Sequence, residues 1–236
     1  MRAITRGAEP QALRQFINDN QTSPQNLHYD NTGTQEKDPM LEQLVRGQHG
    51  LCAYTMRRVV HADGRFNAHI EHILPRTAHP DESLSWTNLL ACFPRTGDCD
   101  FGAKPKAAYD PATQPFVRPD RMVDGHFRFR QNGEVEGLTD AALACIAPKV
   151  HNLNAKELVN DRKAKIQGAL NRRPSAAQAR RRAQALRQPD TQGWLEPYCE
   201  AVAQVLEEHA KRTENAAKRR AGPPARVRAR CRCSKK

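Results

Sequence analysis

The sequence has few aromatic residues, no long apolar run and no even set of cysteines, and each absence excludes a class of protein. Aromatic residues make up 6% and hydrophobic residues 38% of the 236 residues, so we expect part of the chain to lie outside any core. No stretch approaches the roughly 20 apolar residues that span a bilayer. No apolar segment follows the charges of the first ten residues, as a secretory signal requires. We therefore expect a cytoplasmic protein with no membrane association.

The seven cysteines indicate something other than a disulfide scaffold. An odd number, in a chain expected to be cytoplasmic, is typical of reduced thiols, metal ligands or small core residues. Four of the seven lie in apolar helical patterns or in the basic C-terminal tail. The other three, Cys52, Cys92 and Cys99, bracket the densest cluster of His, Asn and acidic residues in the chain.

The positive charge is concentrated towards the C-terminal end. The whole chain has a formal net charge of +12, and from residue 171 onward 17 Lys and Arg residues face 6 Asp and Glu residues. The first 170 residues are therefore nearly neutral. A basic segment of this kind is typical of proteins that bind nucleic acid, because each phosphate contact releases counterions. A solvated helix and tail kept soluble by their charges is the plainer interpretation.

Apolar periodicity and turn signals predict an α+β fold in four segments. Residues 1–37 form an N-terminal arm with one short helix, and residues 38–170 place a small strand-and-loop centre in a mostly helical body. Residues 171–214 form a helical basic extension. Residues 215–236 have no apolar face, which predicts disorder. Helices are expected at 12–19, 39–48, 102–108, 139–150, 154–172, 176–187 and 194–212, and Asn132-Gly133 predicts a two-residue hairpin.

The centre of the chain groups the residue types that phosphodiester hydrolysis needs. His69, Glu71 and His72 are followed about 16 positions later by Asn88, and then by Asp100 in a loop that begins at a cysteine. Mg²⁺ binds through one or two carboxylates with water or phosphate at its other positions. Neutral imidazole is suited to activating water near pH 7. Adjacent side chains of an extended strand point to opposite sides, so we expect a turn to bring Glu71 and His72 to one site.

These runs resemble the HNH endonuclease family. They are most similar to the PtuB-like HNH proteins of Septu and retron-linked antiphage defence systems. The matching runs are residues 41–54, 69–75, 86–90, 99–104 and, farther on, 150–154. The resemblance covers about residues 1–170 and does not extend to the basic segment that follows. It implies that residues 38–170 contain a ββα-metal core.

Carried over position by position, the resemblance implies a role for each residue of the centre. His72 is the general base, and Glu71 and Asp100 are ligands of a catalytic Mg²⁺ or Mn²⁺. Asn88 holds the active-site loop or orients His72, and His69 joins the site or binds the scissile phosphate. Taken singly, Asn88 is also a plausible helix cap, Asp100 a turn residue and His69 an ordinary strand residue. Two further residues are candidate contacts to nucleic acid: Lys104 and Arg76.

The cysteines depart from the pattern of the family. Members often hold a structural zinc ion with four cysteines that begin as Cys-x-x-Cys, whereas Thr55 stands at the second position here. A closed zinc site needs a fourth ligand, for which His49 and His61 are candidates. We expect a packed thiol cluster rather than bound zinc. The cysteines concerned are Cys52, Cys92 and Cys99.

The resemblance thus implies a metal-dependent endonuclease that acts on DNA or on a folded RNA such as tRNA. It also implies a PtuA-type ATPase as partner, and a retron reverse transcriptase complex in some systems. A non-catalytic nucleic-acid-binding module and a zinc-ribbon-like adaptor for a partner protein are the alternatives. The complete set of Glu71, His72, Asn88 and Asp100 argues against the first alternative, and Thr55 argues against the second.

Overall fold

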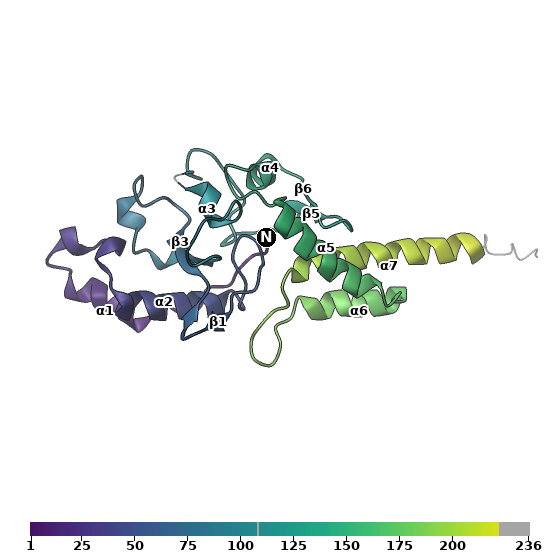
Figure 1. Ribbon diagram of the computed structural model, residues 1–236, viewed down its shortest axis with the longest axis horizontal. Helices are drawn as coiled ribbons and strands as arrows, with labels where there is room; N and C mark the ends of the chain where they lie inside the picture. The colour runs from purple at the N-terminus through teal and green to yellow at the C-terminus, as the bar shows by residue number, and fades with distance from the viewer. Residues whose placement is uncertain (108, 222–236) are drawn as a thin grey trace, which may run out of the picture.

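The computed structural model describes residues 1–107 and 109–221, and it confirms the α+β class: helices surround three small antiparallel strand pairs (Figure 1). The helices are α1 (Gln11–Asp19), α2 (Thr34–Gly47), α3 (Ala103–Lys106), α4 (Asp140–Ile146), α5 (Lys156–Leu170), α6 (Ala176–Leu186) and α7 (Cys199–Ala221). Single 3₁₀ turns lie at η1 (Pro24–Asn26), η2 (Tyr29–Asn31), η3 (Pro80–Glu82) and η4 (Trp86–Asn88). None of the helices in the described ranges combines the length and the apolar character that crossing a membrane requires.

Each strand pair contains two short antiparallel strands. The pairs are β1 (His61–Ala62) with β2 (Arg65–Phe66), β3 (His69–His72) with β4 (Leu89–Cys92), and β5 (Phe127–Phe129) with β6 (Val135–Gly137). The third pair is a hairpin at the expected place, around Asn132-Gly133, but residues 130–134 connect its last pair, Phe129 and Val135, so the expected two-residue turn is wrong. Gly133 has a φ of +92°, and a Cβ there would lie 2.2 Å from the carbonyl oxygen of Val159 in α5. Both the turn and its packing against α5 therefore require glycine.

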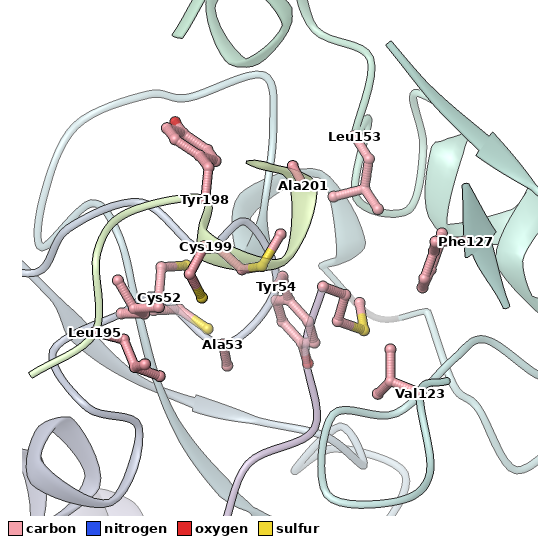
Figure 2. Packing of buried hydrophobic residues seen from close by; sticks show 14 of the residues in the cluster. Cys52, Ala53, Tyr54, Val123, Phe127, Leu153, Leu195, Tyr198, Cys199 and Ala201 are labelled. Carbon is pink, nitrogen blue, oxygen red and sulfur yellow. The ribbon is translucent and has the colours of Figure 1, made fainter. Parts of the chain in front are cut away.

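One continuous core joins the two ends of the described chain. It runs from Leu13 of α1 through Tyr54 to Ala210 of α7, and Figure 2 shows Cys52, Ala53 and Tyr54 packed beside Leu195, Tyr198 and Cys199. The amide of Leu195 donates to the His49 carbonyl, and the amide of Tyr198 donates to the Met56 carbonyl, both at 3.1 Å. The segment after residue 171 thus completes the core instead of standing apart as an extension.

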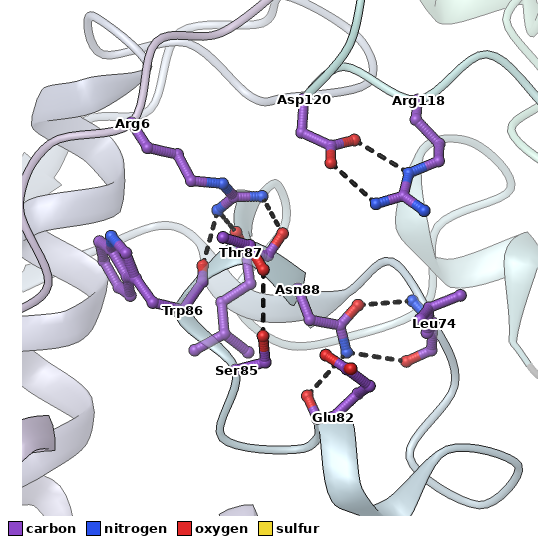
Figure 3. Close-up of polar contacts among 10 residues, drawn as sticks. Arg6, Leu74, Glu82, Ser85, Trp86, Thr87, Asn88, Arg118 and Asp120 are labelled. Atoms are coloured by element: carbon purple, nitrogen blue, oxygen red, sulfur yellow. Dashed lines mark hydrogen bonds and ion pairs between the residues drawn. The ribbon is translucent and has the colours of Figure 1, made fainter.

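The N-terminal arm is also packed against the body. The amide of Ile4 donates to the Pro119 carbonyl at 2.8 Å, and the Trp86 indole donates to the Gly7 carbonyl at 3.0 Å. The guanidinium of Arg6 donates to the carbonyls of Trp86, Thr87 and Leu89 (Figure 3). Arg6 therefore fixes the turn η4 and the start of β4 from a segment about 80 residues away.

Four helix boundaries differ from the sequence-based prediction by four residues or more, and one of them is the end of α4 at Ile146 rather than at residue 150. Helix α2 begins at Thr34 rather than Pro39, and Glu36 in its first turn accepts the Gly33 amide at 2.7 Å. Helix α7 begins at Cys199 rather than Trp194, because Pro197 disfavours helical backbone at the residue before it. It then continues through Asn215 to Ala221, so the change to disorder expected at residue 215 is wrong for 215–221. The rest of that tail, 222–236, lies outside the described residues.

Candidate active site

The strands β3 and β4 and the helix α3 follow one another in the order strand, strand, helix, and β3 and α3 border a cavity of about 560 Å³. All four residues of β3 line the cavity, together with Arg76 after the strand and Lys104 and Lys106 of α3. The expected turn between Glu71 and His72 is absent. Within the described ranges, β3 pairs with β4 alone, from His69 opposite Cys92 to His72 opposite Leu89, and Glu71 and His72 both line the cavity.

Glu71 is joined to a buried lysine of α3. The Lys106 ammonium lies 3.0 Å from Glu71 Oε1 and donates to the His72 carbonyl at 2.9 Å, and 1% of the Lys106 side chain is exposed. Burial on its own raises the pKa of Glu71, but contact with His69 and with the Lys106 ammonium outweighs it and holds the pKa below its usual value. The carboxylate is therefore ionised at neutral pH.

His72 is a buried, neutral imidazole. Burial lowers the pKa of His72 to about 4, although its bond to the Ser83 carbonyl acts in the opposite direction. His72 Nε2 lies 2.9 Å from that carbonyl oxygen, which can only accept, so Nε2 carries the ring proton and Nδ1 keeps its lone pair. Nδ1 has no hydrogen-bond partner among the described residues. The Tyr29 ring meets the imidazole edge-on, with centroids 4.7 Å apart.

Asn88 joins the two ends of the loop that follows His72. Its side-chain oxygen accepts the Leu74 amide at 2.7 Å, and its side-chain nitrogen donates to the carbonyls of Leu74 and Glu82 at 3.2 and 2.9 Å (Figure 3). Glu82 precedes Ser83, the partner of His72. Asn88 is 2% exposed, so its connection to His72 runs through this loop.

His69 lies on the same side of β3 as Glu71. Its Nδ1 is hydrogen bonded to the Pro94 carbonyl oxygen, so that nitrogen carries a proton. Its Nε2 lies 3.8 Å from Glu71 Oε2, which exceeds a hydrogen-bond length. His69 and Glu71 are thus next to each other with an open gap between them.

Asp100 is not placed with Glu71. Its exposed side chain lines a different pocket of about 960 Å³, on the side of Arg57 and Glu157. The Asn152 side chain donates to the Asp100 carbonyl at 2.7 Å, and His151 Nδ1 lies 2.9 Å from the Gly102 carbonyl. The 150–154 run therefore fixes the turn before α3 in a form that directs Asp100 away from the cavity.

The two candidate nucleic-acid contacts lie at the cavity. Lys104 is exposed and borders both this cavity and the pocket of Asp100. Arg76 forms an ion pair with Asp30, and its guanidinium lies over the Tyr29 ring, 5.1 Å from the centroid. Its side chain is 36% exposed. Two cationic groups thus stand beside His72, a suitable arrangement for an anionic substrate.

Two of the three candidate cysteines, Cys52 and Cys92, lie in the core, and the third, Cys99, is only partly buried. The Phe93 amide donates to Cys52 Sγ at 3.4 Å. Burial on its own raises the pKa of Cys52, but the neighbouring Cys92 thiol, Thr55 and the Phe93 amide lower it to about 5. Cys99 instead lines the pocket of Asp100.

The guanidinium of Arg57 lies 4.6 Å from the centroid of the Phe93 ring and 2.6 Å from Glu157. A stacked, paired arginine thus braces this loop.

The two histidines considered as a fourth zinc ligand are used elsewhere. His49 Nδ1 lies 2.9 Å from the Gly193 carbonyl oxygen, and the His61 ring packs on Phe66. Across residues 1–107 and 109–221, no three His, Cys, Asp or Glu side chains are placed to share a metal ion.

A divalent cation in the cavity would take only a few of its ligands from the protein. Lys106 occupies Glu71 Oε1 and leaves Oε2, with His69 Nε2 facing it. One carboxylate and one imidazole are compatible with an ion that takes its remaining ligands from water and phosphate.

Sequence reasoning missed Lys106 and Arg6. Lysine after Pro105 in a short basic helix is typical of a surface residue, and only tertiary packing places Lys106 against Glu71. Arg6 lies in the N-terminal arm, outside the matching runs, and only the folded structure places it against η4 and β4. The chain matches no family model and no curated protein.

Proposed function

We propose that this protein is an HNH-type endonuclease that hydrolyses phosphodiester bonds in nucleic acid. One observation supports it most: a neutral His72, oriented by the Ser83 carbonyl, beside an ionised Glu71 in a cavity with two cationic side chains at its edge. A structural histidine needs neither the unpaired Nδ1 nor the neighbouring charges. The β3–β4–α3 order supports a ββα-metal core in the same way.

In this mechanism His72 is the general base. Its Nδ1 takes a proton from a water molecule whose oxygen attacks the phosphorus, the bond from phosphorus to the leaving oxygen breaks, and that oxygen takes a proton from solvent. A base with a pKa of about 4 is weak in the free protein. A phosphate anion bound beside the ring raises that pKa, so proton uptake is coupled to substrate binding. A cation held at Glu71 would offset the charge that develops on the phosphate.

The cationic side chains act on binding. Arg76 is held in place by Asp30 and Tyr29, so its guanidinium meets a phosphate without a large loss of side-chain freedom. Lys104 extends the positive edge towards the neighbouring pocket. Both contacts suit the backbone phosphates of DNA or RNA and carry no base specificity.

The resemblance to PtuB-like proteins further supports a role as the cytoplasmic effector of an antiphage defence system. It would work with a PtuA-type ATPase and, in retron systems, with a reverse transcriptase complex. Neighbouring genes test this part: an adjacent ATPase gene agrees with it, and a neighbourhood with neither partner contradicts it.

The activity is tested by incubating the purified protein, alone and with the neighbouring ATPase, with plasmid, single-stranded DNA and tRNA. His72→Ala should reduce cleavage by about 10²–10⁴-fold, the usual effect of losing a general base. The matched control is His61→Ala, which changes an exposed histidine outside the cavity. If wild-type protein binds nucleic acid but never cleaves it, a non-catalytic binding module is the better description. If His72→Ala cleaves at the wild-type rate, His72 is not the base.

A further inference from the structure

The gap between His69 and Glu71 is unlike the other contacts of histidine with carboxylates in the described part of the chain. His79 Nε2 lies 2.8 Å from Asp110 Oδ2, a closed hydrogen bond. The third pair, His28 with Asp30, lies 3.4 Å apart. His69 Nε2 and Glu71 Oε2 are 3.8 Å apart, and the space between them opens into the cavity that both residues line.

The second nitrogen of His69 decides what can fill that gap. Nδ1 is committed to the Pro94 carbonyl, so in the neutral ring Nε2 has a lone pair and no proton. In that form a lone pair faces a carboxylate oxygen, and in the protonated ring the Nε2 proton faces it as an ion pair. In either form the two atoms are suited to holding a positive charge between them, and a metal cation can take the place of the proton. Metal-bound histidines typically have this arrangement, with the distal ring nitrogen held by a carbonyl.

We propose that His69 Nε2 and Glu71 Oε2 are the protein's two ligands for the catalytic cation, and that His69, rather than Asp100, determines which ion binds. Two ligand atoms that share an ion at about 2.1 Å each lie roughly 3.0–3.4 Å apart. The observed 3.8 Å closes to that range with a shift of a few tenths of an ångström in each side chain. This inference rests on the proposed function for its biological meaning, but its test measures binding alone.

The lysine on the other carboxylate oxygen determines the kind of ion. Lys106 already balances the charge of Glu71, so an ion that depends on carboxylate charge gains little there, and Mg²⁺ is such an ion. An imidazole nitrogen is a better ligand for Co²⁺ and Ni²⁺ than for Mg²⁺ or Mn²⁺, and Lys106 does not cancel this contribution. The site is therefore selective for borderline transition ions over Mg²⁺.

The experiment is calorimetric titration of the tag-free full chain with Mg²⁺, Mn²⁺, Co²⁺ and Ni²⁺ in turn, with Co²⁺ absorption spectra as a second readout. Wild-type protein should bind one equivalent, with affinity rising from Mg²⁺ to Ni²⁺ by at least about tenfold. His69→Gln retains a side-chain donor for the Pro94 carbonyl. It should lose most of that rise and the imidazole contribution to the Co²⁺ spectrum. Asp100→Asn should bind as wild type does.

Several outcomes overturn the inference: equal affinity for Mg²⁺ and Ni²⁺ in the wild type, unchanged Ni²⁺ affinity in His69→Gln, or loss of binding in Asp100→Asn. Thermal unfolding of each metal-free variant shows whether His69→Gln is folded. If it is not, the Co²⁺ spectrum of the wild type decides, because bands of an all-oxygen site contradict a histidine ligand. Tight, His69-dependent binding of the metal ion without any cleavage of nucleic acid would reject the proposed function but not the proposed metal site.

Discussion

Lys106 Nζ lies 3.0 Å from Glu71 Oε1 while 1% of the lysine side chain is exposed, so the charge of the central carboxylate is balanced from inside the protein. The lysine is also bonded to the carbonyl of the neighbouring residue, His72. It therefore fixes both the rotamer of Glu71 and the backbone at His72. Removing either partner leaves a buried charge without its counterpart.

Lys106→Met should lower the free energy of unfolding by about 3 kcal/mol, the usual effect of breaking a buried ion pair. Lys104→Met, which removes an exposed lysine from the same helix, should change it by less than about 0.5 kcal/mol. Urea unfolding followed by circular dichroism measures both. The double variant Lys106→Met with Glu71→Gln should regain part of the loss. Equal stability of the two single variants would show that the pair contributes little.

Acid should destabilise the protein through its buried histidines. Burial lowers the pKa of His72 and of His151 to about 4, from an ordinary value of 6.5. The unfolded chain therefore binds protons that the folded chain does not, and stability is complete above about pH 6.5 and falls as pH drops towards 4. Each histidine contributes up to roughly 3 kcal/mol of this loss.

His151→Phe separates this effect from the titration of carboxylates. Phenylalanine retains the packing on Tyr54 and Phe116 but cannot bind a proton. Between about pH 6.5 and pH 4.5 the fall in unfolding free energy should be about half that of the wild type. The same slope in both proteins would mean that His151 takes no part.

Asn88→Ala should destabilise the protein and reduce catalysis together. It removes three hydrogen bonds from a residue that is 2% exposed, which costs about 2–3 kcal/mol because buried partners are left unpaired. The loop that places Ser83 against His72 loosens, so kcat should fall more than KM changes. Thr87→Ala, at the exposed neighbouring position, is the control. Full activity in a less stable Asn88→Ala protein would limit Asn88 to a structural role.

Two truncations separate packing from charge. A chain that ends after Arg173 lacks the core residues Leu195, Tyr198 and Cys199, so it should show no cooperative unfolding transition. A chain that ends after Asn215 keeps them and should fold. Its plot of log affinity for nucleic acid against log salt should be flatter, by about 0.7–0.9 for each phosphate that the shortened chain no longer binds. An unchanged salt slope would leave the residues after 215 without a role in binding.

The parts of the fold that sequence predicted were those fixed by neighbouring residues. Asn132-Gly133 marked the position of its hairpin although not the length of the loop, and Thr139 caps α4 by accepting the Ala142 amide. The helix at 176–187 was placed within one residue, because Ser175 and Gln178 form a capping box at its start. For Asn88, the pattern predicted that the side chain holds the active-site loop, and the structure shows its bonds to Leu74 and Glu82. A role of Asn88 in catalysis stays a prediction.

The remaining features depend on contacts between distant segments, which local patterns do not encode. Asp100 is directed away from the cavity by Asn152, about 50 residues later. The charge of Lys106 favours the surface, yet Glu71 and the His72 carbonyl satisfy two of its protons in the interior. The segment from residue 171 onward has the charge of a basic extension, but its apolar residues belong to the core.

The junction between residues 49–58 and the start of α7 also sets when the protein can fold during synthesis. The Arg58 side chain donates to the Leu195 carbonyl, 137 positions away in the sequence. The Met56 carbonyl accepts a hydrogen bond from the Tyr198 amide. Contacts this distant in sequence form late and slowly, because the loop between them must close first. A growing chain on the ribosome therefore carries residues 49–58 without the partners that bond to them in the folded protein. The core around Cys52 and Tyr54 is complete only after translation has passed residue 198.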